Sequence, residues 1–105
     1  MTRKLTIETV LECAADLVNG DRGADYGHPL VNHTATADLF NVYLWRKYGT
    51  ENVPMGIDAD DVCWFNILQK CSRDANVPKR DNLVDVAGYA ENLQRVRDER
   101  DARRS

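Results

Sequence analysis

Apolar residues recur along the chain at the three- and four-residue spacing that is typical of amphipathic helices. The first such pattern follows Thr6, a predicted N-cap, and ends at Gly20. Its apolar positions are Ile7, Val10, Leu11, Ala14, Leu17 and Val18. No segment alternates over a useful length with the two-residue period of a strand. The pattern therefore predicts an all-α domain.

Capping and helix-breaking residues divide the rest of the chain into three more predicted helices. A proline in the first turn opens one of them, and aspartate N-caps open the other two. Their predicted limits are Pro29 to about Tyr48 with Gly49 as the stop, Asp58 to about Asp74, and Asp81 to about Arg97. The sequence thus predicts one domain over residues 1–105, with a core over about 5–97 and a frayed, arginine-rich tail over 98–105.

Composition narrows the class of protein. Of 105 residues, 43% are hydrophobic and 30% are charged, which is the balance of a globular domain. The net charge of -3 argues against general nucleic-acid binding, because a phosphate backbone selects a basic surface. No apolar run approaches the ~20 residues of a membrane span, and no apolar stretch after Met1 resembles a signal peptide. These features predict a cytoplasmic protein without a membrane partner.

The cysteines are Cys13, Cys63 and Cys71, an odd number, and each lies among apolar neighbours inside a helical pattern. They form neither a C-x-x-C motif nor a cluster with zinc-ligand spacing. We therefore expect reduced cysteines that act as small core residues, rather than a disulfide scaffold or a structural zinc site.

The last two predicted helices each separate an apolar face from a polar one. The apolar faces consist of Cys63, Trp64, Ile67, Leu68, Cys71 and Ala75 on one helix, and of Leu83, Val86, Ala87, Ala90 and Leu93 on the other. The polar positions are Asn66, Gln69, Lys70 and Arg73, then Asp81, Asn82, Asp85 and Tyr89. Gly88 shares the polar side, where it lowers helix propensity by about 1 kcal/mol relative to alanine and leaves room for close approach of a helix or a ligand.

Two interpretations of these polar stripes stay open. In the first, the stripes are solvated, and Lys70 or Arg73 pairs with Asp85 across the contact between the helices. In the second, polar side chains of both helices converge on a ligand, as in the small-molecule sites of helical bundles. The candidates are Asn66, Lys70, Arg73, Asn82, Asp85 and Tyr89.

The loop over residues 21–28 concentrates further candidates. Arg22 and His28 could donate charge-assisted hydrogen bonds to a phosphate, and Tyr26 could stack on a base. Asn32 follows in the first turn of a helix whose N-terminus favours anions. The structural alternatives are that the His28 side chain takes part in a capping hydrogen bond that shapes the turn and that Tyr26 is a lid on the core.

A second cationic pair, Lys79 and Arg80, precedes the last predicted helix. Positive charge at a helix start opposes the helix dipole by a few tenths of a kcal/mol. Either a bound anion or the neighbouring Asp81 would offset this conflict.

Three segments together resemble a family of small phage-encoded proteins of uncharacterised function. They are Asp21–Pro29, Asp61–Lys70 and Lys79–Tyr89. The last two helices are more distantly similar to the all-α nucleoside triphosphate pyrophosphohydrolases of the MazG type. That resemblance implies a four-helix bundle completed by homo-oligomerisation. It also implies paired acids, E-x-x-E and E-x-x-D, which hold the Mg²⁺ that binds the triphosphate and activates water.

This chain departs from the MazG pattern at the acids. Asn82-Leu83-Val84-Asp85 matches E-x-x-D with asparagine in place of glutamate, while Lys70-x-x-Arg73 takes the place of E-x-x-E. Two carboxylates replaced by two cations change the local charge by about four units, which repels Mg²⁺ and favours phosphate. We therefore expect binding without a metal cofactor and without hydrolysis.

The sequence thus predicts a phage-type protein that binds a nucleotide, or another phosphorylated small molecule, in a cationic pocket between helices. One use would be to sequester a host antiviral messenger in the host-cell cytoplasm. One alternative is a Mg²⁺-dependent nucleotide pyrophosphohydrolase that uses Asp85 with other acids, for example Asp38. Another is a protein-interaction module that docks through its exposed helices and arginine-rich tail.

Large aromatic residues crowd the second predicted helix. They are Phe40, Tyr43, Trp45 and Tyr48, too many for a single face. This crowding indicates a subunit interface of a homo-oligomer, or else a core on two sides of the helix.

Overall fold

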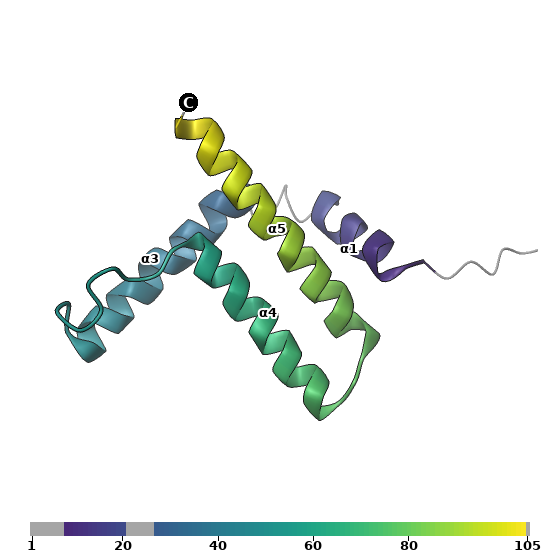
Figure 1. The fold of residues 1–105 in the computed structure, drawn as a ribbon, viewed down its shortest axis with the longest axis horizontal. Helices are drawn as coiled ribbons and strands as arrows, with labels where there is room; N and C mark the ends of the chain where they lie inside the picture. Colours follow the sequence, from purple (N-terminus) through teal and green to yellow (C-terminus); the bar gives the residue numbers. More distant parts are fainter. Residues whose placement is uncertain (1–7, 21–26, 105) are drawn as a thin grey trace, which may run out of the picture.

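The computed structural model describes residues 8–20 and 27–104, and these form helices and loops without any strand. The helices are α1 (Val10–Asn19), α3 (Pro29–Tyr48), α4 (Ala59–Asn76) and α5 (Arg80–Arg104). Figure 1 shows α4 and α5 as an antiparallel hairpin, with α1 on the other side of α5 and α3 crossing near the start of α4. The all-α prediction is confirmed.

Local capping determines where the helices begin. The N-cap of α1 is Thr9, three residues beyond the predicted Thr6, because Thr9 and Glu12 form a reciprocal capping box. Asp58 caps α4 as predicted, and it forms the same reciprocal pair with Asp61. The limits of α3 also agree with the prediction, and the N–H of its C-cap, Gly49, donates to the carbonyl of Trp45.

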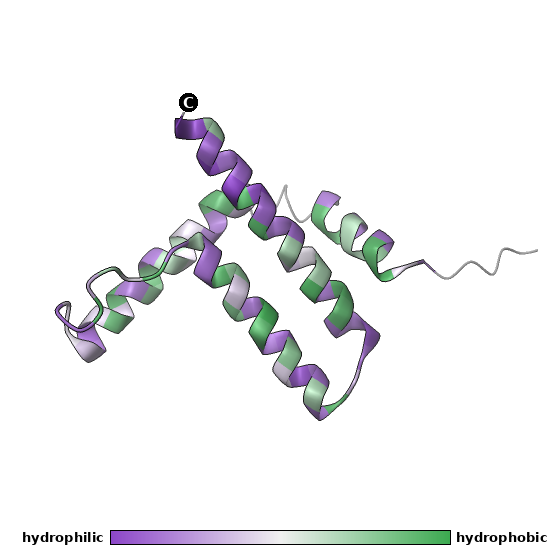
Figure 2. Ribbon diagram, viewed as in Figure 1, coloured by the Kyte–Doolittle hydropathy of each residue, from purple (hydrophilic) through white to green (hydrophobic). Residues whose placement is uncertain are grey.

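The α5 helix is longer than the sequence suggested. It begins at Arg80, one residue before the predicted cap Asp81, and it continues to Arg104 instead of ending near Arg97. Two of its arginines hold this extension against α4, because Arg97 and Arg100 donate to Asp60 at 3.1 and 2.8 Å. Figure 2 shows that the C-terminal part of α5 is hydrophilic, so charge pairing rather than apolar packing anchors it.

The centre of the hydrophobic core lies between α4 and α5. Ala59 and Cys63 pack against Leu93 and Val96, and Leu30 of α3 covers this cluster. The predicted apolar face of α4 is only half covered, because Trp64 and Leu68 are exposed while Val62, assigned to neither face, is buried. The contact with α5 is therefore narrower than the apolar stripe on α4.

The cysteine prediction holds in part. All three cysteines are free, but only Cys63 is buried, while Cys13 is half-buried and Cys71 is exposed. Burial, with a smaller contribution from the nearby Asp60 charge, raises the pKa of the Cys63 thiol to about 11. Cys63 is thus an inert core residue, and the expectation of a core position is wrong for Cys71.

The loop between α3 and α4 folds back along α3. The side chain of Asn41 accepts from the N–H of Ile57 at 2.7 Å and donates to its carbonyl at 2.9 Å. Gly56 adopts a positive φ of 66° beside this pair, where a Cβ atom would lie 2.7 Å from Asn41 Oδ1. Trp45 adds a hydrogen bond to the carbonyl of Val53. These contacts position the start of α4.

Among the described helices, none has both the length and the apolar character needed to cross a bilayer.

Candidate functional site

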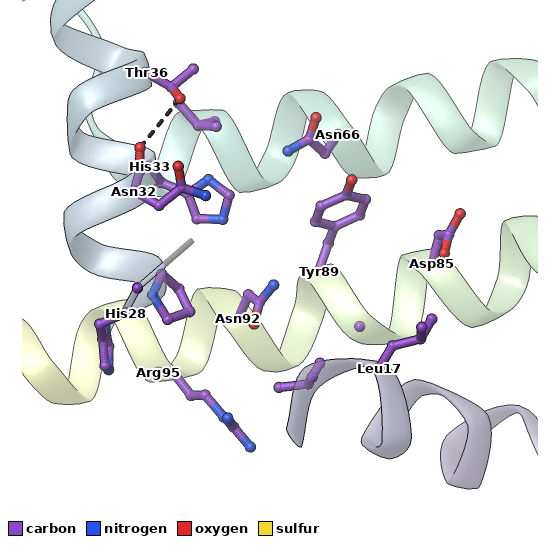
Figure 3. Close-up of a pocket in the computed structure, with 15 residues that line it drawn as sticks. Leu17, His28, Asn32, His33, Thr36, Asn66, Asp85, Tyr89, Asn92 and Arg95 are labelled. Carbon is purple, nitrogen blue, oxygen red and sulfur yellow. Dashed lines mark hydrogen bonds between the residues drawn. The ribbon is translucent and has the colours of Figure 1, made fainter. Parts of the chain in front are cut away.

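A pocket of about 580 Å³ lies where the four helices meet (Figure 3), and its size suits a small molecule. We call it the interhelical pocket. Its polar lining residues are His28, Asn32, His33, Thr36, Asn66, Asp85, Tyr89, Asn92 and Arg95. Its other lining residues are Leu17, Val18, Gly27, Pro29, Val62 and Gly88.

The start of α3 forms one wall. His28 is the N-cap of α3, and its Nδ1 atom accepts a 3.0 Å hydrogen bond from the N–H of Leu30. Pro29, which has no N–H to satisfy, occupies the first helical position. The capping role considered for His28 is therefore confirmed, and the same residue also borders the pocket.

His33, one turn further along α3, is a buried polar residue that is only 7% exposed. Asn41 and Asn82 are comparably buried, but both form side-chain hydrogen bonds. No residue of the described part of the chain gives His33 a hydrogen-bond partner. Burial lowers the pKa of His33, so its ring is neutral near pH 7 and presents one donor and one acceptor.

The opposite wall is one face of α5, whose pocket residues recur at helical spacing. Figure 3 shows Tyr89 with its hydroxyl directed toward Asn66 of α4, and Asn92 one turn along α5. Within the described ranges, the side chains of Asn66, Tyr89 and Asn92 have no hydrogen-bond partner. The middle of the pocket is thus lined by uncharged groups that are available to a ligand.

Charged residues lie toward the two ends of this α5 face, and both are paired. Asp85 Oδ2 lies 2.8 Å from Lys70 Nζ of α4, and the two side chains are 28% and 16% exposed. Arg95 Nε lies 2.8 Å from Glu91, and its Nη2 donates to Asn19 of α1 at 2.7 Å. A guanidinium has five N–H donors, so Arg95 retains donors beyond these two bonds.

The residues predicted to form a site separate into groups. His28, Asn32, Asn66, Asp85 and Tyr89 line the interhelical pocket, and Lys70 touches it through Asp85. Four of the predicted residues do not line the pocket. Arg73 and Lys79 are exposed, and Asn82 donates a hydrogen bond to Asp74. Arg80 donates to the Glu8 carbonyl and to Cys13 Sγ near α1. Arg22 and Tyr26 lie outside the described residues.

The Lys70–Asp85 pair is the ion pair that the first interpretation of the polar stripes anticipated. The pocket beside it corresponds to the second interpretation, although its lining is mostly uncharged and Arg95 is its one cation among the described residues.

Asp38, considered for a metal-dependent alternative, is exposed and does not line the pocket. Nowhere in residues 8–20 and 27–104 do three or more metal-ligating His, Cys, Asp or Glu side chains gather.

Residues 9–97 match the family described as "Domain of unknown function (DUF6378)". The chain belongs to the DUF6378 family. It is 38% identical over 96 residues to the Gene 55 protein of Mycobacterium phage L5, and 36% identical over 93 residues to that of Mycobacterium phage D29. Each alignment covers 88% of this chain but 56% of the relative, so the chain spans little more than half the length of these proteins. No solved structure matches.

These findings confirm the resemblance to a phage protein family, whereas the MazG resemblance remains a hypothesis. Every residue that lines the interhelical pocket, from Leu17 to Arg95, lies inside the range that matches the DUF6378 family. Arg100 and Arg103, near the end of α5, lie beyond it. The pocket therefore belongs to the family domain and not to the arginine-rich end of α5.

Sequence reasoning missed four polar residues of this DUF6378 pocket as ligand candidates: His33, Thr36, Asn92 and Arg95. Asn92 and Arg95 continue the spacing of Asp85, Gly88 and Tyr89 along α5, so the helical period was a signal that could have found them. His33 carried no such signal, because its burial follows from the way α3 crosses the α4–α5 hairpin.

Proposed function

We propose that this DUF6378 domain binds a nucleotide or a nucleotide-derived signal in the interhelical pocket without hydrolysing it. The observation that carries the proposal is a pocket of about 580 Å³ in which Asn66, Tyr89 and Asn92 have no hydrogen-bond partner among the described residues. Amide side chains, a phenol and a nearby guanidinium together suit a ligand with a heterocyclic base and a phosphate.

Binding is favoured over turnover by the state of the pocket's acid. Asp85 is held by Lys70 at 2.8 Å, so its charge is already neutralised. In the resemblance to MazG-type enzymes, Lys70 and Arg73 stand where acids would hold Mg²⁺. An ammonium group beside the carboxylate competes with a divalent cation for the same oxygen. The Mg²⁺-dependent pyrophosphohydrolase thus becomes the second outcome of the test.

The phage relatives suggest a biological use. The two Gene 55 proteins come from mycobacteriophages, and phage proteins are synthesised inside the host cell. A domain that binds a nucleotide without consuming it would lower the free concentration of a host messenger, such as one used in antiviral signalling. This proposal places the protein in the host-cell cytoplasm and requires it to be abundant relative to the messenger.

We also propose that the domain assembles with a second copy of itself through an apolar patch on α3 and α4. The patch consists of Phe40, Tyr43 and Phe65, all exposed, and the ring of Phe40 lies 5.8 Å from that of Tyr43 and 6.0 Å from that of Phe65. Leu39, Trp64 and Leu68 of the same two helices are also exposed. At on the order of 100 Å² for each exposed side chain, the six residues together present roughly 600 Å², compared with the roughly 800 Å² that each partner contributes to a standard interface.

Sedimentation velocity tests this assembly. We expect the wild-type protein to form dimers or higher homo-oligomers and Phe65→Glu to shift it to monomer. Met55→Glu is the matched control, because Met55 is 91% exposed on the α3–α4 loop and lies outside the patch. A monomeric wild-type protein at concentrations of about 100 µM would contradict the proposal.

The binding proposal is tested with a panel of linear and cyclic nucleotides. The purified protein is incubated with each compound, with and without Mg²⁺, and separated from free ligand. It is then heat-denatured, and the released compounds are identified by chromatography. Intact nucleotide released only after denaturation supports the proposal. Mg²⁺-dependent monophosphate and pyrophosphate support the hydrolase, and a stable protein complex with indifference to every nucleotide supports an interaction module.

A further inference from the structure

We propose that the interhelical pocket binds its nucleotide base-first, with the base held by His33, Asn66, Tyr89 and Asn92 and the phosphate directed toward Arg95 and His28. This inference rests on the proposed function and adds the orientation of the ligand and the chemical group that is recognised.

His33 provides the first argument. The residue is only 7% exposed, it lines the pocket from α3, and its ring has no hydrogen-bond partner among the described residues. No fully buried side-chain nitrogen or oxygen of these residues lacks a partner, so the ring nitrogens of His33 remain accessible. A ligand that fills the pocket can form hydrogen bonds with them. Because the neutral imidazole presents one donor and one acceptor, it matches a base edge that carries both kinds of group.

The uncharged groups that α4 and α5 contribute to the pocket provide the second argument. Asn66 and Asn92 each offer a carbonyl oxygen and an amide N–H₂ group, and Tyr89 adds a hydroxyl that is directed toward Asn66 (Figure 3). Side-chain amides pair with the donor and acceptor groups of base edges. A phosphate, in contrast, is best held by cations, and this part of the lining has none. The middle of the pocket is therefore suited to a base.

The position of the cation provides the third argument. Figure 3 shows Arg95 and His28 on the same side of the pocket, away from Asn66 and Asp85. At the Asp85 end, Lys70 is engaged by the carboxylate at 2.8 Å. Arg95 keeps N–H donors beyond its bonds to Glu91 and Asn19, so a phosphate at this end gains charge-assisted hydrogen bonds.

The test separates the two ends of the ligand. The five common nucleosides, their 5′-monophosphates and ribose 5-phosphate are titrated into the wild-type protein by calorimetry. We expect at least one nucleoside to bind within about tenfold of its monophosphate, and ribose 5-phosphate not to bind. We expect His33→Phe and Asn66→Ala each to weaken nucleoside binding by about tenfold or more, and Arg95→Gln to remove only the advantage of the phosphate. Gln69→Ala, an exposed amide on α4, is the matched control.

A second readout does not depend on variants that fold. The chain has two histidines, His28 and His33, so the ring ¹⁵N signals of the wild-type protein are few and assignable. Saturation with a nucleoside should shift the ring nitrogens of His33, because its hydrogen bonding changes on binding. Unshifted His33 nitrogens at saturation would overturn the inference.

The outcomes also distinguish this inference from the proposed function. Binding of a nucleotide together with ribose 5-phosphate, but of no nucleoside, overturns the base-first orientation and leaves nucleotide binding intact. Failure of every linear and cyclic nucleotide overturns the proposed function, and the inference falls with it.

Discussion

Lys70 Nζ lies 2.8 Å from Asp85 Oδ2 and joins α4 to α5 at the edge of the interhelical pocket. Both side chains are mostly buried, so the pair is screened less than a surface ion pair. The lysine is therefore engaged by protein before any ligand arrives. This pair explains why a pocket expected to be cationic is lined mainly by uncharged groups.

Removing Lys70 should expose the charge of its partner. In Lys70→Ala the Asp85 carboxylate loses its counter-charge and repels an approaching phosphate, so we expect weaker nucleotide binding, by roughly threefold to tenfold, with nucleoside binding less affected. The double variant Lys70→Ala/Asp85→Asn removes the uncompensated charge and should recover most of the affinity. If the double variant binds as poorly as Lys70→Ala, then Lys70 itself contacts the phosphate.

Gly88 offers a test that separates folding from binding. A Cβ atom at this position would meet Val18 Cγ2 at 3.7 Å, an ordinary contact, and would narrow the pocket that Gly88 lines. Alanine also raises helix propensity by about 1 kcal/mol. We expect Gly88→Ala to unfold at higher urea concentration than wild type while binding nucleotide more weakly. Unchanged affinity in a stabilised variant would mean that the ligand does not reach α5 at Gly88.

The burial of His33 predicts a pH dependence of stability. Its pKa is lowered by burial, so below the ordinary value of about 6.5 the unfolded chain takes up protons more readily than the native protein. The free energy of unfolding should therefore fall as the pH decreases from about 7 toward 5. His33→Phe removes the titrating group and should flatten this slope, measured by urea denaturation across that range. Equal slopes for the two proteins would contradict the assignment.

The end of α5 should depend on Asp60. Burial alone would raise the pKa of Asp60, but hydrogen bonds from Arg100 and Arg97 outweigh burial and lower the pKa. We expect Asp60→Asn or Arg100→Ala to destabilise the fold by about 1–3 kcal/mol, with a double-mutant cycle showing that the effects are coupled. Arg103→Ala breaks a more exposed pair with Glu99 within the same helix and should change stability by less than about 0.5 kcal/mol. Equal effects of Arg100→Ala and Arg103→Ala would contradict the anchoring role.

Much of the fold was predictable because its signals are local. Proline and capping residues gave the limits of α3 and the start of α4, and the Thr9–Glu12 pair, unlike Thr6, satisfies both halves of a capping box. The end of α5 was missed because a tertiary contact, Arg100 with Asp60, extends the helix past the last apolar residue. Helical period predicted the apolar face of α4, but not how much of that face α5 covers.

The site was only partly predictable for a similar reason. Asn66, Asp85 and Tyr89 were found because helical spacing aligns them, and the same spacing would have added Asn92 and Arg95. Lys70 was identified as a phosphate ligand because the sequence does not show which cation a carboxylate engages. The burial of His33 was not predictable from helical spacing, since only the crossing of α3 over the hairpin buries it.

The most direct measurement is the recovery of bound nucleotide from the protein itself. Wild type, Tyr89→Ala and the control Gln69→Ala are incubated with linear and cyclic nucleotides, freed of unbound compound and heat-denatured. The account predicts that wild type and Gln69→Ala release an intact nucleotide, without any need for Mg²⁺, and that folded Tyr89→Ala releases little or none. Release of hydrolysed products, or equal release from folded Tyr89→Ala, would contradict it.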